Sequence, residues 1–366
     1  MAAQPHVLFL GSGYAGHRTR FSNLVEHSQH DGRINPSYRL VSGWRDDGVI
    51  ERAGFVPRSM RGRIRAATEA SNLLRVPRPD VVWTAALTAI RPWIPWYSGP
   101  MRRPLIIDRD CTSEARDAWS YVYWNRPPHR GTRRRVHEWL DKALADRVTF
   151  WTPWSQWAAD SLLAAGIPEE RVRVLPPGVD LTHWRAPEGG RPAPRERVRL
   201  LFVGGDFTRK GGEMLLDVLE AWGECGFELD IVTREAVRER PGVRVHRAEP
   251  NSPLLRCLYE RADAFIMPSV AECFGIATVE AMASGLPVIV GDTGAGPEIV
   301  GPEAGWVIQP TREGIAEALR GAWALREDLP AMGAAARNRA ETRFDGVAND
   351  RAVVDLVLEA SEHGRR

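Results

Sequence analysis

The chain has 366 residues, of which 43% are hydrophobic and 26% are charged, and its formal net charge is +2. At roughly 150 residues per domain, this length predicts two globular domains that bury sizeable cores. The near balance of charge argues against a dedicated nucleic-acid binder, which is usually strongly basic. No apolar run approaches the ~20 residues that a membrane-spanning helix needs.

The N-terminus and the cysteines bear on the cellular compartment. Residues 1–13 lack the basic and long apolar regions of a signal peptide. The four cysteines are Cys111, Cys225, Cys257 and Cys273, and they form no C-x-x-C pair. The spacings of the cysteines and of the histidines match no common metal site. We therefore expect a cytoplasmic protein with reduced thiols, no disulfide framework and no bound metal.

Apolar runs alternate with helical patterns in the first half of the chain. Strands are predicted at 6–10, 38–42, 81–87, 104–110 and 147–153. Helices are predicted at 17–29, 132–145 and 154–165. Such alternation is typical of βαβ units and a parallel sheet.

The alternation restarts after residues 186–197, which are rich in proline, glycine and charge and are typical of a linker. Later strands are predicted at 199–205, 227–233, 262–268 and 287–292, and helices at 212–222 and 347–360. We therefore expect two α/β domains, at 1–185 and 198–345, and a C-terminal segment, 346–366, that packs back on the first domain. Two Rossmann-like domains that face each other place a ligand cleft between the carboxyl ends of their strands.

The clearest chemical motif is A-E-C-F-G-I-A-T-V-E at 271–280. A strand ends before it and a helix begins near Gly275, so free amides lie at a helix N-terminus, where they bind phosphate. Glu272 precedes this helix, and Glu280 lies within it, with seven residues between the two. Carboxylates are poor phosphate ligands but accept hydrogen bonds from the hydroxyl groups of a sugar and a ribose. The motif indicates a nucleotide sugar; surface charge at a helix start is the alternative.

The stretch 262–300 around this motif resembles the E-x7-E region of glycosyltransferase family 4, a retaining family with the GT-B fold. The glycine–basic loop at 202–212 and the segments at 155–172 and 172–184 resemble further parts of that family. The resemblance is specific over about 150–310 and weak over 1–145. It implies two facing Rossmann-like domains with a cleft between them, the N-terminal one for an acceptor and the C-terminal one for a nucleotide-sugar donor.

The resemblance also implies a donor site. Glu272 contacts the donor sugar, Glu280 holds the ribose, and Lys210 neutralises phosphate charge as the bond to the sugar breaks. That lysine replaces a metal ion, so the resemblance implies neither a metal nor another cofactor. The donor-site residues are Gly16, Gly205, Arg209, Lys210, Glu272, Phe274, Gly275, Ile276, Ala277 and Glu280.

The chain departs from the family at Gly205, where many relatives have arginine. Arg209 is available instead, but its side chain should leave the backbone in a different direction from that of Lys210. Lys210 is therefore the stronger expectation for the phosphate, and a solvated pair of loop charges is the alternative.

A second glycine loop follows the first strand, with Gly11, Gly13 and Gly16 in the G-x-G-x-x-G spacing of dinucleotide-binding proteins. The acid that normally ends the second strand of such proteins is missing, since none comes before Asp46. We favour the interpretation that the turn near Gly16 approaches the donor phosphate across the cleft. An NAD(P)-dependent oxidoreductase and a purely structural turn are the alternatives.

The acceptor side is less clearly marked. Relatives often have a histidine after the strand that corresponds to 104–108; here Asp110 lies nearest to that position, and His17 lies on the glycine loop. Each of these two residues either orients an acceptor hydroxyl or has a structural role. Of the two, Asp110 is the candidate for a catalytic residue. Trp119 and Trp124 stack on an acceptor or belong to the core. A retaining transfer needs no strong general base, because the leaving phosphate can take the acceptor proton.

The expected partners are a nucleotide diphosphate sugar and a sugar, lipid or natural-product acceptor, without nucleic acid. The sequence contains two arginine clusters. Such clusters occur in relatives that dock peripherally on the inner face of an anionic membrane, and the alternative is that they form solvated surfaces. They are Arg58, Arg61, Arg63 and Arg65, and Arg130, Arg133, Arg134 and Arg135. A non-catalytic nucleotide-sugar-binding relative is the remaining alternative for the function.

Overall fold

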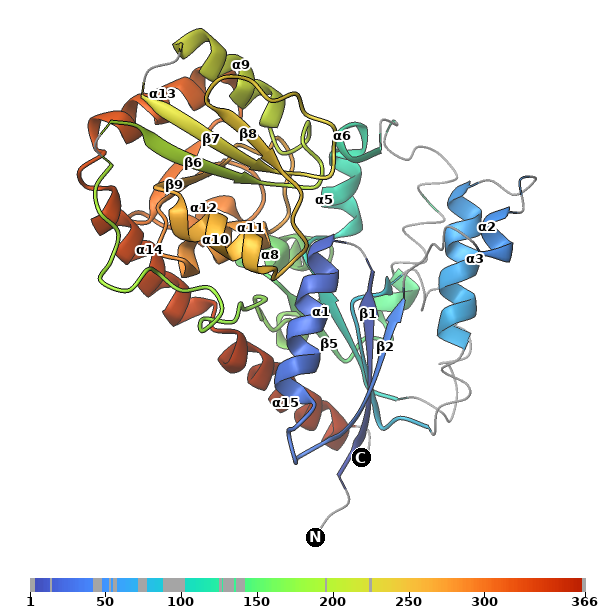
Figure 1. Ribbon diagram of the computed structural model, residues 1–366. Coiled ribbons are helices and arrows are strands. Elements are labelled where there is room, and N and C mark those ends of the chain that lie inside the picture. The colour runs from blue at the N-terminus through green and yellow to red at the C-terminus, as the bar shows by residue number, and fades with distance from the viewer. Residues whose placement is uncertain are drawn as a thin grey trace.

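A computed structural model of the chain describes residues 4–363 apart from 14, 42–47, 53, 55–57, 72–77, 88–102, 125–126, 128–134, 136–141, 195 and 224–225. The chain forms two lobes, each built on one sheet with helices packed against it (Figure 1). The strands within each sheet are parallel. In the described part of the chain, no helix has both the length and the apolar character needed to cross a membrane.

The first lobe contains a five-stranded sheet in the order β2-β1-β3-β4-β5. Its strands are β1 (His6–Ser12), β2 (Asn35–Val41), β3 (Val81–Thr84), β4 (Leu105–Arg109) and β5 (Phe150–Pro153). Its helices are α1 (Ala15–Ser28), α2 (Val49–Arg52), α3 (Arg58–Ser71), α5 (Ser113–Ala118), α6 (Ser120–Trp124), α8 (Gln156–Ala164) and the 3₁₀ turn η3 (Glu169–Arg171). The central strands β1, β3 and β4 are apolar and buried, because helices cover both faces of a parallel sheet. The helix predicted at 132–145 lies largely outside the described residues.

The second lobe contains a six-stranded sheet in the order β11-β10-β9-β6-β7-β8. Its strands are β6 (Val198–Val203), β7 (Phe227–Val232), β8 (Val243–His246), β9 (Ala264–Met267), β10 (Val288–Gly291) and β11 (Gly305–Ile308). Its helices are α9 (Gly212–Trp222), α10 (Pro253–Arg261), α11 (Ile276–Ala283), α12 (Gly296–Val300), α13 (Arg312–Ala324) and α14 (Leu329–Arg343). The sequence did not predict β8 and β11, which are half-exposed edge strands and therefore lack a strong apolar signal.

The strand order reverses next to the first strand of each sheet. In the first lobe β1 lies between β2 and β3, and in the second β6 lies between β7 and β9. Ligands of open parallel sheets bind beyond the carboxyl ends of the strands at such a reversal. In the second lobe, that topology brings residues 204–211, which follow β6, beside residues 268–275, which follow β9.

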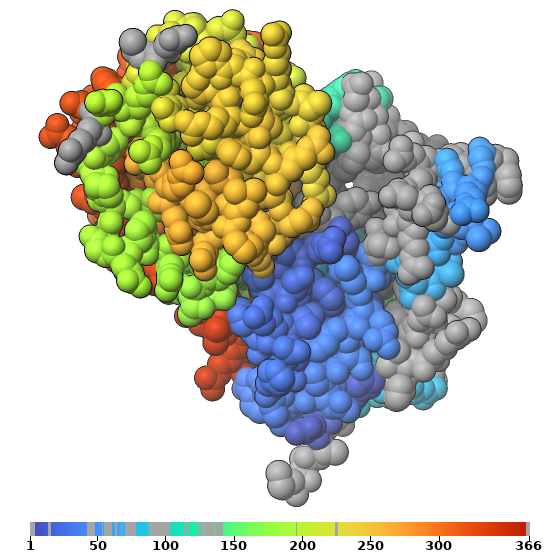
Figure 2. Space-filling view, in the orientation of Figure 1, coloured from blue at the N-terminus to red at the C-terminus, as the bar shows by residue number. Residues whose placement is uncertain are grey.

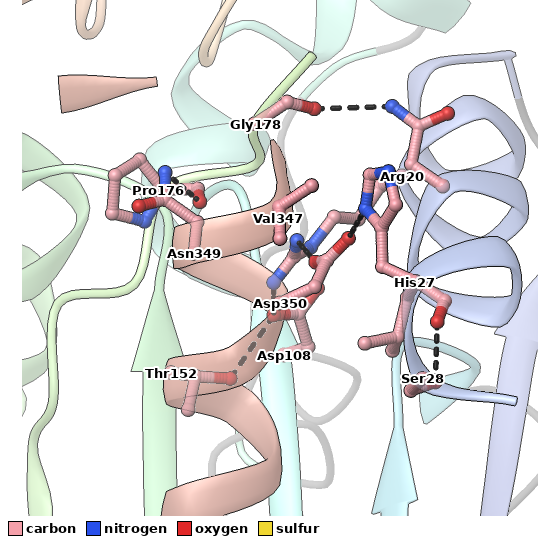
Figure 3. A network of polar contacts seen from close by, with 12 residues as sticks. Arg20, His27, Ser28, Asp108, Thr152, Pro176, Gly178, Val347, Asn349 and Asp350 are labelled. Atoms are coloured by element: carbon pink, nitrogen blue, oxygen red, sulfur yellow. Dashed lines mark hydrogen bonds and ion pairs between the residues drawn. The ribbon is translucent and has the colours of Figure 1, made fainter. Parts of the chain in front are cut away.

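The last helix, α15 (Gly346–His363), follows the second lobe but packs against the first (Figure 1). Its buried residues Val353 and Val357 join the core formed by Val7, Phe9 and other residues of the first sheet. A polar network accompanies this packing, in which Asp350 of α15 lies between Arg20 and His27 of α1 (Figure 3). The chain thus closes on itself across the junction of the lobes.

The charges of this network are buried. Asp350 Oδ1 pairs with Nη1 of Arg20, whose side chain is wholly buried, and Asp350 Oδ2 lies 2.7 Å from His27 Nδ1. Asp108, also buried, lies 4.0 Å from Arg20 Nη2 and accepts hydrogen bonds from Thr152 and Trp154. A buried charge is tolerated only when partners of this kind surround it.

Replacing Asp350 with asparagine should therefore lower the free energy of unfolding by about 3–5 kcal/mol, because it leaves the Arg20 charge largely uncompensated. Denaturant unfolding of the purified variant measures the loss. Asp355→Asn is the matched control, since the exposed Asp355 on the same helix pairs with Arg33, and such a pair is worth about 1 kcal/mol or less. Equal losses in both variants would contradict the assignment.

The network also predicts how stability depends on pH. The hydrogen bond to Asp350 raises the pKa of His27 above its ordinary 6.5, against the effect of burial. The stability that protonated His27 contributes is fully present below pH 6.5 and is lost as pH rises through the raised pKa. The difference in melting temperature between the unmodified protein and His27→Gln should shrink as pH rises above 6.5. A difference that stays constant or widens would show that His27 carries no such charge.

Candidate functional site

Two loops of the second lobe meet at the carboxyl edge of its sheet. Nζ of Lys210, in the loop after β6, lies 2.8 Å from Oε2 of Glu272, in the loop after β9. Gly204 permits this approach, since a Cβ added there would lie 2.4 Å from Cδ of Lys210. The chain has only two lysines, and one of them stands at this reversal of strand order.

Arg209 points to the same carboxylate, so the expectation that it leaves in another direction is wrong. Its Nη1 lies 3.6 Å from Glu272 Oε2 and donates to the backbone oxygen of Ala271 at 2.6 Å. The reason is the tight turn of the loop, in which the Lys210 amide donates to the backbone oxygen of Asp206. The Asp206 carboxylate holds Arg209 Nε at 2.8 Å and so folds the long side chain back over the turn.

These two cations determine the charge of Glu272. Burial alone would raise the pKa of this carboxyl, but Lys210 and Arg209 outweigh that effect and lower the pKa. The carboxylate therefore stays ionised near neutral pH and acts only as a hydrogen-bond acceptor.

The start of α11 follows Glu272 after three residues. Gly275 has φ of 86°, a left-handed conformation that other residues adopt only with strain, and it turns the chain into the helix. Among the described residues, no side chain caps α11, so its first amides, including those of Ile276 and Ala277, are available to an anion. Phe274 is buried and packs edge-on against Trp154 of the first lobe, with ring centroids 5.7 Å apart.

Glu280 is nearly buried within α11 and is ordered by a residue that the sequence did not single out. The hydroxyl of Tyr259, on α10, donates to Glu280 Oε2 at 3.1 Å. Burial raises the pKa of Glu280 to about 7, although Tyr259 and Lys210 act in the opposite direction. A buried tyrosine needs a partner for its hydroxyl, but only the fold shows which one it has.

The first lobe approaches α11 through the glycine loop. A Cβ added at Gly16, in the first turn of α1, would lie 3.5 Å from Cδ1 of Ile276. Figure 2 shows this start of α1, in dark blue, against the orange surface of the second lobe. Gly11 has a packing role instead, since a Cβ there would lie 2.2 Å from Cγ of Phe21. Gly16 therefore lies against the first residue of α11, and its approach to a donor phosphate stays a prediction.

The two acceptor candidates lie together on the first lobe. His17 Nε2 is 3.4 Å from Asp110 Oδ2, and the His17 ring packs on Trp154 with centroids 4.6 Å apart. Trp119 stacks on Trp157, with centroids 5.6 Å apart and an interplanar angle of 12°.

Several sequence-predicted residues lie outside this description. The side chain of Trp124 is outside the described residues, as are the side chains of Arg58 and Arg63 and of Arg130, Arg133 and Arg134. In the first arginine cluster, Arg65 forms a two-pronged ion pair with Glu51 and so serves the packing of α2 on α3. Gly205 is described and borders open space, with no heavy atom within 4 Å of an added Cβ.

The lobes also touch through contacts that the sequence did not predict. Tyr123 of α6 lies under Arg209, with the guanidinium carbon 4.6 Å from the ring centroid, and its hydroxyl is 3.7 Å from Cys273 Sγ. Glu298 Oε2, on α12, accepts hydrogen bonds from the first amides of α8, those of Gln156 at 2.8 Å and Trp157 at 3.3 Å. Charge complementarity at a helix start explains the latter contact.

Three potential metal ligands from two distant parts of the sequence come together in the fold. One ligand atom each of Asp110, Cys111 and Cys273 lies within 4.8 Å of the others. Cys111 and Cys273 are 162 positions apart and come from different lobes, so no local spacing motif could reveal them.

The raised pKa of Glu280 predicts that the free energy of unfolding depends on pH. Between pH 4.5 and 7 the folded state keeps a proton that the unfolded chain releases, so stability falls as pH rises, by roughly 3 kcal/mol in total. Glu280→Gln lacks this cost and should gain stability over the unmodified protein through that window, as thermal melts would show. Glu317→Gln, on the exposed face of α13, is the control. If the gain in melting temperature of Glu280→Gln did not change with pH, the folded protein would not hold Glu280 in its protonated form.

Comparison with known proteins agrees with this architecture. A family model described as "Glycosyltransferase Family 4" matches residues 32–183, and one described as "Glycosyl transferases group 1" matches residues 197–324. Among curated proteins, an MMP alpha-(1->4)-mannosyltransferase of Mycolicibacterium hassiacum is 33% identical over 194 residues, 50% of this chain and 46% of that protein. The chain spans about half the length of the curated relatives it matches.

Solved structures show the same fold. Sucrose-phosphate synthase from Thermosynechococcus elongatus superposes with a TM-score of 0.75 at 16% identity, over 98% of this chain and 99% of that one. Anabaena HepE, solved in complex with UDP-glucose, superposes with a TM-score of 0.69 at 16% identity, over 97% and 100%. From its two matched segments and its two-lobed parallel fold, the chain belongs to glycosyltransferase family 4 and has the GT-B architecture.

Proposed function

We propose that the chain is a retaining glycosyltransferase that transfers a sugar from a nucleotide diphosphate sugar to an acceptor hydroxyl without a metal ion. The observation that carries the proposal is the meeting of Lys210 with Glu272 beside the uncapped start of α11. A cation, a row of free amides and an ionised carboxylate are the groups that a sugar linked to a diphosphate requires.

The donor would bind at the carboxyl edge of the second sheet. Its diphosphate would accept hydrogen bonds from the amides of Gly275, Ile276 and Ala277, with the Lys210 ammonium beside it. Glu272 would accept hydrogen bonds from hydroxyl groups of the sugar, and Glu280 from the ribose. HepE was solved with UDP-glucose, which supports a nucleotide sugar as the class of donor for this fold.

In the proposed reaction, the bond between the anomeric carbon and the phosphate oxygen breaks, and its electron pair goes to the phosphate. Lys210 stabilises the negative charge that develops on the phosphate in the transition state. Stabilising that charge lowers the barrier and so increases the rate. The acceptor oxygen bonds to the anomeric carbon on the face that the phosphate leaves, and its proton passes to the leaving phosphate. No metal and no strong general base take part.

Arg209 would supply the second positive charge. The resemblance to the family implies an arginine in many relatives at the position of Gly205, and here that position borders open space. The Arg209 guanidinium reaches Glu272 from the neighbouring turn, on the ring of Tyr123. We propose that it replaces the missing arginine by ordering Glu272 and adding positive potential at the diphosphate.

The acceptor would enter from the first lobe. Asp110 and His17 are adjacent there, and either can accept a hydrogen bond from the attacking hydroxyl. The stacked pair of Trp119 and Trp157 provides a flat aromatic surface for a sugar ring or a planar natural product. We place the reaction in the cytoplasm, in line with the three described cysteines being free thiols.

The oxidoreductase alternative is not favoured. Both family models that match the chain are glycosyltransferase models, and Gly11 of the dinucleotide-like loop has a packing reason for being glycine. A binding protein without activity differs from the proposal only in turnover, so the experiment must measure both binding and release of nucleotide.

A thermal-shift screen against UDP-, GDP-, ADP- and dTDP-sugars, followed by assays of nucleotide release, tests the proposal. The true donor should raise the melting temperature, because it binds only the folded state. Lys210→Ala should lower kcat about 10²–10³-fold, as loss of transition-state charge stabilisation does. Lys142→Ala, at the other lysine, which is exposed, should leave kcat unchanged. Absence of both binding and release for every sugar nucleotide would refute the function.

A further inference from the structure

Two thiols and a carboxylate from opposite lobes meet where the lobes face each other. Asp110 and Cys111 follow β4 of the first sheet, and Cys273 lies between Glu272 and the start of α11. One ligand atom from each residue lies within 4.8 Å of the other two. Both thiols are almost fully buried, with 2% and 3% of Cys111 and Cys273 exposed, while the Asp110 side chain is 26% exposed.

The spacing of these atoms suits a tetrahedral metal ion. With Zn–S near 2.3 Å and Zn–O near 2.0 Å, neighbouring ligand atoms lie about 3.5–3.8 Å apart. The three atoms therefore need to close by only about 1 Å. Two thiolates with one carboxylate form a soft ligand set that selects zinc over magnesium or calcium.

The segments that carry the ligands are held in place. Thr112, next to Cys111, caps α5 by accepting a hydrogen bond from the Ala115 amide. The backbone oxygen of Cys273 accepts a hydrogen bond from the Ala295 amide at 3.0 Å. A metal site binds tightly when its ligands are positioned before the ion arrives.

Two further residues lie against the ligands and can support them. The Tyr123 hydroxyl, 3.7 Å from Cys273 Sγ, can donate to a thiolate. His17 Nε2, 3.4 Å from Asp110 Oδ2, can orient a ligating carboxylate. Supporting contacts of this kind hold metal ligands in their orientation.

We propose that Asp110, Cys111 and Cys273 form a zinc site that bridges the two lobes. On binding, both thiols lose their protons to solvent, the two sulfurs and one Asp110 oxygen coordinate the ion, and the exposed side of Asp110 leaves the fourth position to water. The ion is not a cofactor for transfer. It joins the lobes next to Glu272 and Asp110, and, if the proposed function holds, it inhibits transfer by occupying the space between donor sugar and acceptor.

Titration of the full chain with Co²⁺, under a phosphine reductant and without donor or acceptor, tests the site. Co²⁺ substitutes for zinc and reports thiolate ligands by a charge-transfer band in the near ultraviolet and tetrahedral geometry by strong visible bands. We expect one Co²⁺ per chain, displaced by Zn²⁺. Cys111→Ser and Cys273→Ser should each lower the affinity at least ten-fold and weaken the band. Cys257→Ser, at an exposed cysteine elsewhere, should leave both unchanged.

Asp110→Asn keeps both sulfurs and should retain the charge-transfer band while the affinity for Co²⁺ falls. This variant keeps the test decisive should a serine variant fail to fold, which its melting curve would reveal. A missing band in the unmodified protein, or a band of unchanged strength in Cys111→Ser and Cys273→Ser, would overturn the proposal. Since the titration contains no sugar nucleotide, its failure is distinct from a failure of the proposed transferase activity.

Discussion

The carboxyl ends of parallel strands must meet at one edge of a sheet, and this constraint determines where the functional side chains of this protein lie. In the second lobe, β6 and β9 are neighbours at the reversal of strand order, so their loops bring Lys210 against Glu272. In the first lobe, the start of α1, which follows β1, and the loop after β4 bring His17 against Asp110. The two edges face each other, and the contacts between Trp154 and Phe274 and between Gly16 and Ile276 join them.

The electrostatics of the site follow from what surrounds each carboxyl. Glu272 and Glu280 belong to one short segment, yet their pKa values move in opposite directions. Glu272 has two cations beside it and stays ionised, whereas Glu280 is buried against the hydroxyl of Tyr259 and keeps its proton close to neutral pH. Environments that separate the pKa values of two carboxyls also separate their chemical tasks. In the proposed donor complex, one would accept hydrogen bonds from the sugar and the other from the ribose.

The relative placement of the lobes depends on the chain crossing between them twice. At the crossing, the amide of Val179 donates to the backbone oxygen of Phe344, and the amide of Gly346 donates back to that of Val179. Gly178 and Gly346 allow the two segments to touch, since a Cβ on Gly178 would lie 2.4 Å from Cα of Gly346. Beyond this point the buried charge network around Asp350 attaches α15 to α1. Because α15 follows the second lobe and packs on the first, its attachment to α1 also holds the two lobes, and the cleft between them, in place.

The sequence alone determined the features that depend on local order: two series of alternating strands and helices, glycine turns after β1 and β6, and a helix that begins between Glu272 and Glu280. It missed the edge strands β8 and β11, whose exposed faces weaken the apolar pattern. Only the tertiary structure decided which side chains meet across long separations. The turn of Arg209 toward Glu272, the contact of Tyr259 with Glu280, and the gathering of Cys111 with Cys273 depend on strand order and on how the lobes pack, and neither leaves a periodic trace in the sequence.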